Sequence, residues 1–162
     1  MLIRYLYGLL GQSASVFFNI LNMFLFGNLP PFGSVVVIVE DQGRFLVLRR
    51  HGEYVFPGGF MRWREHPTQT GRREVYEETG LDVKIGALIG YHSADSTSFV
   101  RMSTLILVFR GEVIGGELRG GIEGRPFWVD EAELQANLVP YYAHLLEKYR
   151  AVREKTCSPE VS

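Results

Sequence analysis

The segment GFMRWREHPTQTGRREVYEETGL, at residues 59–81, constrains the fold of this 162-residue chain more than any other. Pro67 suits the first position of a helix, because its missing N–H would have no partner there. Gly80 suits the residue just after a helix, where φ is positive. The pattern between them therefore predicts a helix of about three and a half turns.

The predicted helix carries an acidic face. Glu74, Glu77 and Glu78 are spaced i, i+3 and i+4, so their carboxylates lie on the same side. Carboxylates about 6 Å apart repel by roughly 3 kcal/mol per pair at an effective dielectric near 20, and Arg73 can face only part of the set. We therefore expect a divalent cation, Mg²⁺ or Mn²⁺, which binds carboxylate oxygens together with substrate phosphates.

A loop of small residues precedes this helix. An acidic helix face on its own is more simply explained as a solvated surface. Here Gly58 and Gly59, in the sequence Phe-Pro-Gly-Gly, allow the backbone to approach a metal or a phosphate closely. Glu65 follows, just before the helix. Together these features favour a site for a metal–diphosphate complex.

The constrained positions form the pattern G-x5-E-x7-R-E-V-x-E-E-x-G-L, from Gly59 to Leu81. This pattern resembles the defining box of the Nudix hydrolases, and the resemblance covers roughly residues 33–150. It implies a Nudix-type α/β/α sandwich with a mixed sheet. It also implies a metal-dependent hydrolase acting on a nucleoside diphosphate joined to another moiety, such as a nucleotide sugar, an ADP-ribose-like compound or a nucleoside triphosphate.

An alternative is a nucleotide-binding or regulatory module that has kept this fold without strong catalysis. The intact set of acids and Arg73 favours the enzyme. The resemblance implies that the three acids of the helix face bind metal with the Gly58 carbonyl, and that Arg73 orients them. Glu65 is expected to bind metal or to support a ligand. The general base stays open among four acids: Glu74, Glu78, Glu117 and Glu123.

Substrate contacts are expected around the glycine loop. Arg49 and Arg50 end a predicted strand that leads toward Gly59, so one of the two should reach phosphate. Arg62 stands where many Nudix relatives have an acid. It therefore removes a metal ligand, and it either faces solvent or grips phosphate, as guanidinium groups do well. Three aromatic residues are candidates for stacking on a base, although each also fits the core or the rim: Phe60, Trp63 and Phe99.

Hydrophobic periodicity predicts five strands around this segment, at residues 34–39, 44–49, 84–91, 99–113 and 126–129. Asp130 should cap a short helix that ends near Asn137, and the apolar spacing of residues 141–153 predicts a final helix. Strands and helices mixed in this order imply an α/β fold with helices on both faces of a mixed sheet.

Charge and cysteine content limit the functions open to the chain. Seventeen Lys and Arg side chains stand against 18 Asp and Glu, a net charge of −1. No basic excess favours nucleic acid, so we expect a small-molecule substrate. The single cysteine, Cys157, forms no disulfide framework and fits a reducing compartment.

The first 30 residues are expected to form a separate apolar helical extension, with the hydrolase domain at residues 31–162. No charged side chain occurs between Tyr5 and Val39. Polar residues repeat at spacings of three and four and form one narrow stripe: Gln12, Ser15, Asn19 and Asn22. The remaining apolar surface is too large to stay exposed. The helix must therefore cover the sheet, pair with a second subunit or enter lipid.

The apolar runs of this extension are short for a membrane-spanning helix. A helix that lies on lipid normally carries Lys and Arg on its polar face, whereas this stripe holds only amides and hydroxyls. We therefore predict a cytoplasmic homodimer in which Asn19 or Asn22 forms hydrogen bonds across the two helices. Membrane contact through residues 1–28 is the alternative.

Overall fold

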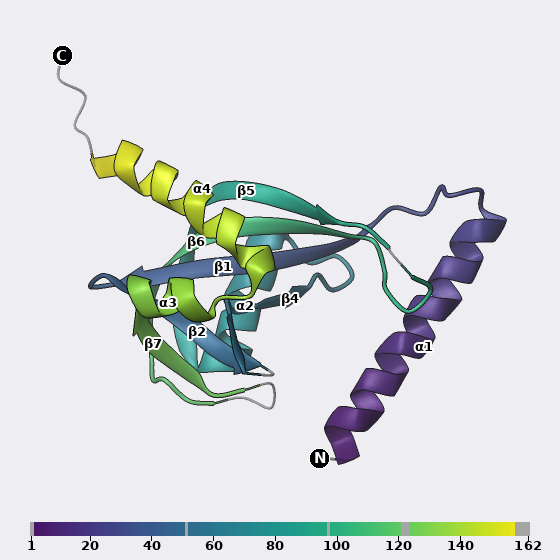
Figure 1. The fold of residues 1–162 in the computed structure, drawn as a ribbon, viewed down its shortest axis with the longest axis horizontal. Coiled ribbons are helices and arrows are strands. Elements are labelled where there is room, and N and C mark those ends of the chain that lie inside the picture. The colour runs from purple at the N-terminus through teal and green to yellow at the C-terminus, as the bar shows by residue number, and fades with distance from the viewer. Residues whose placement is uncertain (1, 51, 97, 121–123, 158–162) are drawn as a thin grey trace.

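The computed structural model describes residues 2–50, 52–96, 98–120 and 124–157. The chain forms four helices and seven strands in those ranges (Figure 1). In chain order the elements are α1 (Leu2–Phe24), β1 (Phe32–Asp41), β2 (Arg44–Arg50), β3 (Glu53–Val55), β4 (Gly58–Phe60), α2 (Pro67–Thr79), β5 (Leu81–Ala94), β6 (Thr104–Gly116), β7 (Pro126–Asp130), α3 (Glu131–Asn137) and α4 (Pro140–Cys157).

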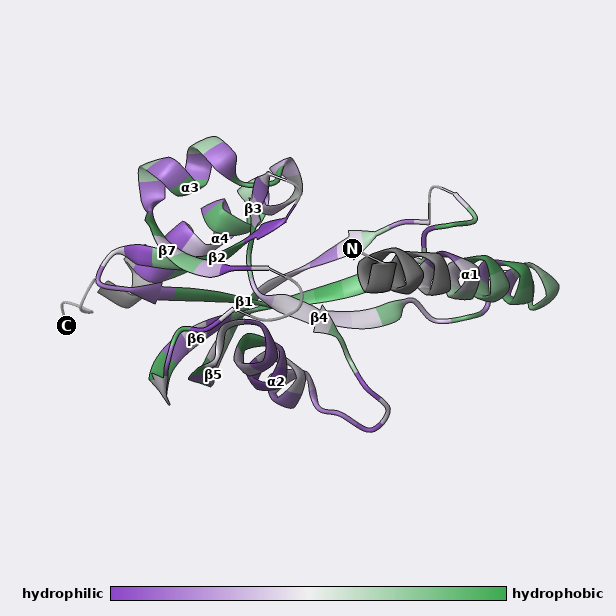
Figure 2. Cartoon of the chain, turned by 90° about the horizontal axis from the view of Figure 1, so that it is seen from below, coloured by the Kyte–Doolittle hydropathy of each residue, from purple (hydrophilic) through white to green (hydrophobic). Residues whose placement is uncertain are grey.

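The strands form one mixed sheet in the order β3-β2-β1-β6-β5, with β4 also paired to β1 and β7 to β2. β1 runs parallel to β6, and the other pairs are antiparallel. Helix α2 covers one face of the sheet, and α3 and α4 cover the other (Figure 2). The α/β/α sandwich with a mixed sheet that the sequence predicts is confirmed.

Strand β1 supplies side chains to both layers of the core. Val35 and Val37 belong to the cluster on the α2 side, whereas Val36 and Ile38 belong to the cluster on the α3 and α4 side. This alternation follows from the two-residue period of a strand. Because β1 is buried on both faces, its sequence reads as a continuous β-branched run rather than as alternating polar and apolar residues.

Helix α2 packs very closely on the sheet at Gly71. A Cβ atom at this position would lie 3.0 Å from Val37 Cγ2 and 3.2 Å from Val35 Cγ1. Glycine costs about 1 kcal/mol of helix propensity relative to alanine, and the short approach between α2 and β1 offsets that cost. The acidic helix is thereby held directly against the central strand.

Helix α2 begins at Pro67 and ends before Gly80, as the sequence predicts, and both of its ends are capped. At the N-cap, His66 Nδ1 accepts from Thr68 N at 3.4 Å, and His66 N donates to the Gln69 side chain at 2.9 Å. At the other end Gly80 has a φ of 75°, and its N–H donates to Tyr76 O at 2.9 Å. These local interactions fix the helix at Pro67–Thr79.

Several strand bounds differ from the sequence-based prediction. β5 (Leu81–Ala94) extends three residues further at each end, and β6 ends at Gly116 rather than at Val113. β6 begins at Thr104 rather than at Phe99, because the segment before it folds into a turn held by the Arg101 N–H on Ser98 O at 3.0 Å. β3 and β4 were predicted as loop. Each is only three residues long, too short to show a two-residue period, and each exists because it pairs with a longer strand.

Helix α1 is present as predicted but does not cover the sheet. It extends away from the sandwich and approaches it at the connection between β5 and β6 (Figure 1). No helix among the described residues is long and apolar enough to cross a membrane. The amides predicted to bond a second subunit bond their own chain instead, since Asn19 Nδ2 donates to Phe99 O and Arg101 O, both at 2.9 Å.

Candidate active site

Strand β4 places the glycine loop directly against the acidic face of α2. A Cβ atom at Gly59 would lie 2.5 Å from the Glu74 carboxyl carbon. A Cβ atom at Gly58 would lie 2.2 Å from Val35 O, on the backbone of β1. Both glycines are therefore required for close approach, Gly59 to the acids and Gly58 to the sheet. The predicted approach of these glycines to a metal or a phosphate stays a prediction.

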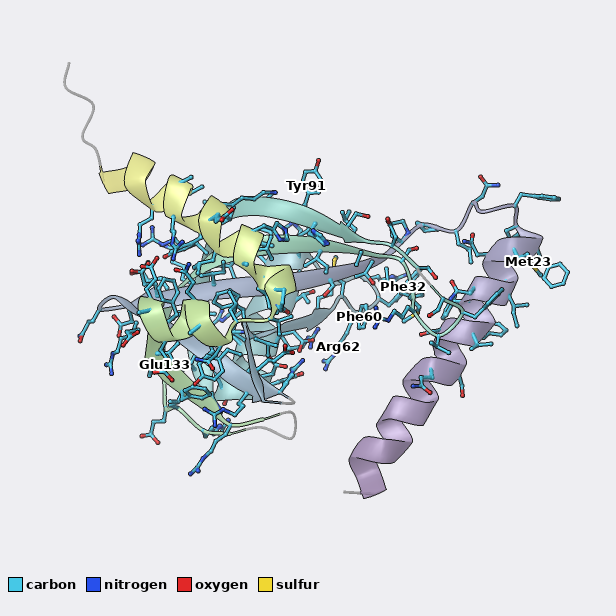
Figure 3. The ribbon with its side chains drawn as sticks, in the orientation of Figure 1. Met23, Phe32, Phe60, Arg62, Tyr91 and Glu133 are labelled. Carbon is cyan, nitrogen blue, oxygen red and sulfur yellow. The ribbon has the colours of Figure 1, made fainter. Side chains whose placement is uncertain are left out.

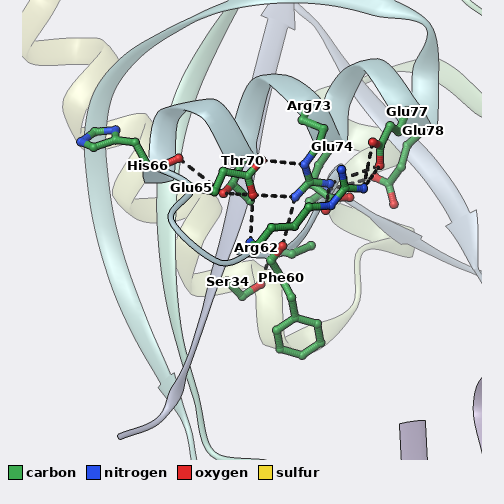
Figure 4. A network of polar contacts seen from close by, with 12 residues as sticks. Ser34, Phe60, Arg62, Glu65, His66, Thr70, Arg73, Glu74, Glu77 and Glu78 are labelled. Atoms are coloured by element: carbon green, nitrogen blue, oxygen red, sulfur yellow. Dashed lines mark hydrogen bonds and ion pairs between the residues drawn. The ribbon is translucent and has the colours of Figure 1, made fainter. Parts of the chain in front are cut away.

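Arg73 lies at the centre of the polar network (Figure 4). Its Nη1 donates to Glu74 at 2.5 Å and to Glu77 at 3.2 Å, and its Nη2 donates to Phe60 O at 3.1 Å. Its side chain is only 17% exposed. These contacts hold two acids of the helix face in fixed positions relative to β4.

Glu65 is bound on the other side of the same guanidinium group. Its two oxygens accept from Arg73 Nε at 2.7 Å and Nη2 at 2.9 Å. Arg62 N and Thr70 Oγ1 also donate to it, at 2.9 and 2.8 Å. The hydrogen bonds from Arg73 lower the pKa of Glu65 to about 2. Glu65 is thus an ionised acceptor that positions Arg73.

Glu78 is buried, with 3% of its surface exposed. It forms an ion pair with Arg50 and accepts from Gly58 N at 3.0 Å. The structure therefore brings the end of β2, the glycine loop and the C-terminal part of α2 together at one carboxylate. Arg50 is thus placed beside the acids, and the predicted contact of one of the two arginines with phosphate stays a prediction.

Arg49 lies on the opposite face of the sheet, because successive strand residues point to opposite sides. Its Nη2 donates to Tyr54 Oη at 3.1 Å, and its guanidinium carbon lies 5.4 Å from the ring centres of Tyr54 and Phe127. The two rings belong to the α3 and α4 side of the core. The structure thus separates Arg49 from the acidic face.

Of the remaining residues predicted to contact substrate, some lie near the glycine loop and others lie further from the acids. Arg62 Nη2 lies 3.1 Å from Glu77, in an exposed ion pair, and Phe60 is half exposed nearby (Figure 3). Trp63 is 88% exposed. Phe99 lines a depression beside α1 with Met23, away from the acids.

Of the two later-loop acids, Glu117 follows β6, and its carbonyl oxygen lies beside Gly80 at the end of α2. Arg119 N donates to Thr79 O at 2.8 Å in the same connection. Glu123 lies outside the described residues. The connection after β6 therefore reaches the C-terminal end of the acidic helix.

Residues 30–149 match the family model of the NUDIX domain. The chain belongs to the Nudix family. It is 33% identical over 120 residues to a MutT-like protein of Streptomyces ambofaciens, covering 70% of this chain and 75% of that protein. It is also 33% identical over 102 residues to an ADP-ribose pyrophosphatase of Methanocaldococcus jannaschii, covering 60% of each. These relationships make it a Nudix hydrolase.

The fold comparison agrees. A NUDIX hydrolase from Nitrosomonas europaea superposes with a TM-score of 0.66 at 25% identity, covering 75% of this chain and 90% of that one. A UDP-X diphosphatase superposes with a TM-score of 0.68 at 17% identity, covering 79% and 65%, and shows the shared fold. The Nudix region begins at residue 30, so α1 lies outside it.

Guanidinium groups lie against the acids of this Nudix box. In the described part of the chain, no group of three or more His, Cys, Asp or Glu side chains converges closely enough to hold a metal ion. Instead Arg73 contacts Glu74, Arg62 contacts Glu77 and Arg50 contacts Glu78. The acids are nevertheless hard oxygen donors beside a loop that has no room for a Cβ. They fit Mg²⁺ or Mn²⁺, provided that metal contacts replace part of these ion pairs.

Proposed function

We propose that this Nudix hydrolase is a divalent-metal-dependent pyrophosphohydrolase. Its substrate would be a small nucleoside diphosphate joined to another moiety. The observation that carries the proposal is the acidic face of α2 beside the Gly58-Gly59 loop. Glu74 lies against Gly59, Glu78 accepts from Gly58 N, and Arg73 joins Glu74 to Glu77. The ADP-ribose pyrophosphatase and MutT-like relatives support this class of substrate.

The three acids and the Gly58 carbonyl would hold the metal. Bound Mg²⁺ or Mn²⁺ would neutralise the diphosphate and lower the pKa of the attacking water. Arg73 keeps Glu74 and Glu77 in place, and Glu65 keeps Arg73 in place. Because both carboxylate oxygens of Glu65 accept hydrogen bonds, we assign Glu65 a positioning role rather than direct contact with metal.

We assign phosphate binding to Arg50. Its guanidinium group lies at the glycine loop on the Glu78 carboxylate. A metal ion bound by this carboxylate would weaken the ion pair and allow Arg50 to contact a substrate phosphate. Arg62 is exposed on the same side and would contact an outer phosphate. Phe60, half exposed beside it, would contact the base or the second moiety.

The general base is best sought at the two acids beside the glycine loop. Glu74 lies against Gly59, and Glu78 accepts from the Gly58 N–H. Glu117 is the further choice, because its backbone borders the end of α2. Variants E74Q, E78Q and E117Q separate these assignments. Only the loss of the base should remove the acidic limb of the pH–rate profile when turnover is measured at saturating metal.

We further propose that residues 31–162 form the catalytic domain of a protein that works in the cytoplasm. The lone cysteine fits that reducing compartment. The near balance of basic and acidic residues supports a small-molecule substrate rather than a nucleic acid.

The test is a hydrolysis screen in Mg²⁺, Mn²⁺ and EDTA with nucleotide sugars, ADP-ribose, dinucleoside polyphosphates and nucleoside triphosphates. One of these classes should be cleaved with metal and not with EDTA.

E77Q and E78Q should lower kcat at least ~100-fold. The control E112Q changes an exposed acid on β6 and should stay within about twofold. Near-normal turnover by both box variants would contradict the mechanism, and nucleotide binding without turnover would indicate the regulatory module instead.

A further inference from the structure

Helix α1 turns its polar stripe toward its own domain. Ser15 is buried and donates to Gly11 O at 2.9 Å, and Asn19 bonds the connection between β5 and β6. The Asn22 side chain accepts from Leu29 N at 3.0 Å. On the same side, the rings of Phe18 and Phe32 pack edge to face at 4.7 Å. Ser15, Asn19 and Asn22 therefore use their polar groups within the chain, whereas Gln12 is exposed.

The opposite face of α1 is apolar and exposed, the reverse of an ordinary surface helix. Figure 2 shows this hydrophobic character along the C-terminal half of α1, and Figure 3 places Met23 near the end far from the sandwich. The tip of the β5–β6 connection extends the apolar area. The outer patch consists of Phe17, Ile20, Met23, Phe24, Leu25, Phe26, Phe99 and Val100, which are 41–93% exposed.

We propose that the outer patch is an interface between two copies of this chain. The exposed residues Phe17, Ile20 and Phe24 are separated by three and then four positions. In the sequence the same three–four spacing continues upstream through Ser13, Leu10, Leu6 and Ile3. A seam that repeats every 3.5 residues is the pattern of one helix packed against another. The same spacing also fits a helix lying on lipid, so the choice of a second copy rests on the charge and the area of the outer patch.

The size of the outer patch matches a dimer interface. α1 has 23 residues and is therefore about 34 Å long at 1.5 Å per residue. Taking about 200 Å² for a full aromatic side chain and somewhat less for an aliphatic one, the patch exposes roughly 850 Å². A stable complex buries about 800 Å² on each partner. Pairing along α1 therefore supplies the required area from this helix and the β5–β6 tip.

Charge also favours a second copy over lipid. No charged side chain occurs between Tyr5 and Val39, so two identical patches meet without repulsion. A helix that lies on anionic lipid uses Lys and Arg to bind head groups, and the polar stripe of α1 has none and faces inward.

The experiment measures the mass of the full-length protein in detergent-free buffer by sedimentation across a range of concentrations. The wild type should be a dimer. F17E/I20E should weaken dimerisation at least ~100-fold, because it places four carboxylates in the apolar seam. L88E, which adds a charge at an exposed apolar position on β5, should leave the dimer intact. All three proteins should keep the same hydrolase turnover, which shows that the domain is folded.

A monomeric wild type, or an F17E/I20E protein that remains as dimeric as the wild type, would overturn the proposal. Vesicles of phosphatidylcholine, with and without phosphatidylglycerol, separate lipid binding from self-association. The dimer should stay in the supernatant. A wild type that requires detergent, or that sediments with either vesicle, would show that the outer patch binds lipid and would equally overturn the proposal. F17Q/I20Q replaces the same two apolar side chains without adding charge, and it should also weaken dimerisation in the sedimentation experiment.

Discussion

Arg73 binds both carboxylate oxygens of Glu65, through Nε at 2.7 Å and Nη2 at 2.9 Å. Two parallel charged hydrogen bonds of this kind fix the plane of both groups. The segment that enters α2 is thereby tied to the second turn of the helix. The same guanidinium group then reaches Glu74, so the orientation of an acid at the site depends on a residue that precedes the helix.

The first prediction concerns the pH dependence of this pair. The pKa of Glu65 is lowered to about 2 from an ordinary value of 4.5. A lowered pKa contributes stability above the unfolded value, and this stability is lost as pH falls from about 4.5 toward 2. E65Q should therefore be less stable than the wild type at pH 7, by about 1.5–3 kcal/mol. Urea unfolding at pH 7, 5 and 3 should show the gap closing, and a gap of constant size would contradict the assignment.

The second prediction concerns activity without loss of stability. In G59A the new methyl group would meet the Glu74 carboxyl group, the far end of a flexible side chain. Glu74 can rotate away, so kcat should fall at least ~100-fold while the melting temperature stays close to that of the wild type. G115A is the matched control, because a Cβ there meets nothing within 4 Å. Equal activities of G59A and G115A would rule out the steric argument.

The third prediction concerns stability at the neighbouring glycine. In G58A the methyl group would meet Val35 O at 2.2 Å, and a backbone carbonyl in a central strand cannot rotate away. G58A should therefore lose about 1–3 kcal/mol of unfolding free energy, the usual cost of overpacking. Thermal unfolding of G58A beside G59A measures this difference. A G58A protein as stable as G59A would show that β4 shifts freely on β1.

The fourth prediction separates two consecutive arginines. R50A removes the guanidinium group beside Glu78, so it should raise KM and lower kcat/KM at least ~10-fold, with R50K retaining part of the activity. R49A loses only contacts with Tyr54 and Phe127 on the other face and should keep the wild-type KM. Steady-state kinetics on the best substrate decide the matter. A larger effect of R49A on KM would reverse the assignment.

Local sequence signals predicted α2 correctly, because Pro67, the box acids and Gly80 act within a few residues of one another. The β-branched run of β1 was equally clear. The spacing of the acids fixed their helix face but not their partners, since Arg50 reaches Glu78 from 28 positions away in the chain. Likewise, the polar stripe of α1 was visible, but the carbonyl groups of residues 98–101 that receive Asn19 lie in a turn without a sequence signal.

The glycine loop is fastened to β1 at both ends. Pro57 O accepts from Val37 N at 2.9 Å, and Met61 N donates to Gly33 O at 3.0 Å. Amide hydrogens of this loop should accordingly exchange with solvent as slowly as those of the central strand. Directed evolution toward new substrates should therefore succeed in the connections after β5 and β6, where insertions are tolerated. Most substitutions within the glycine loop itself should give inactive variants.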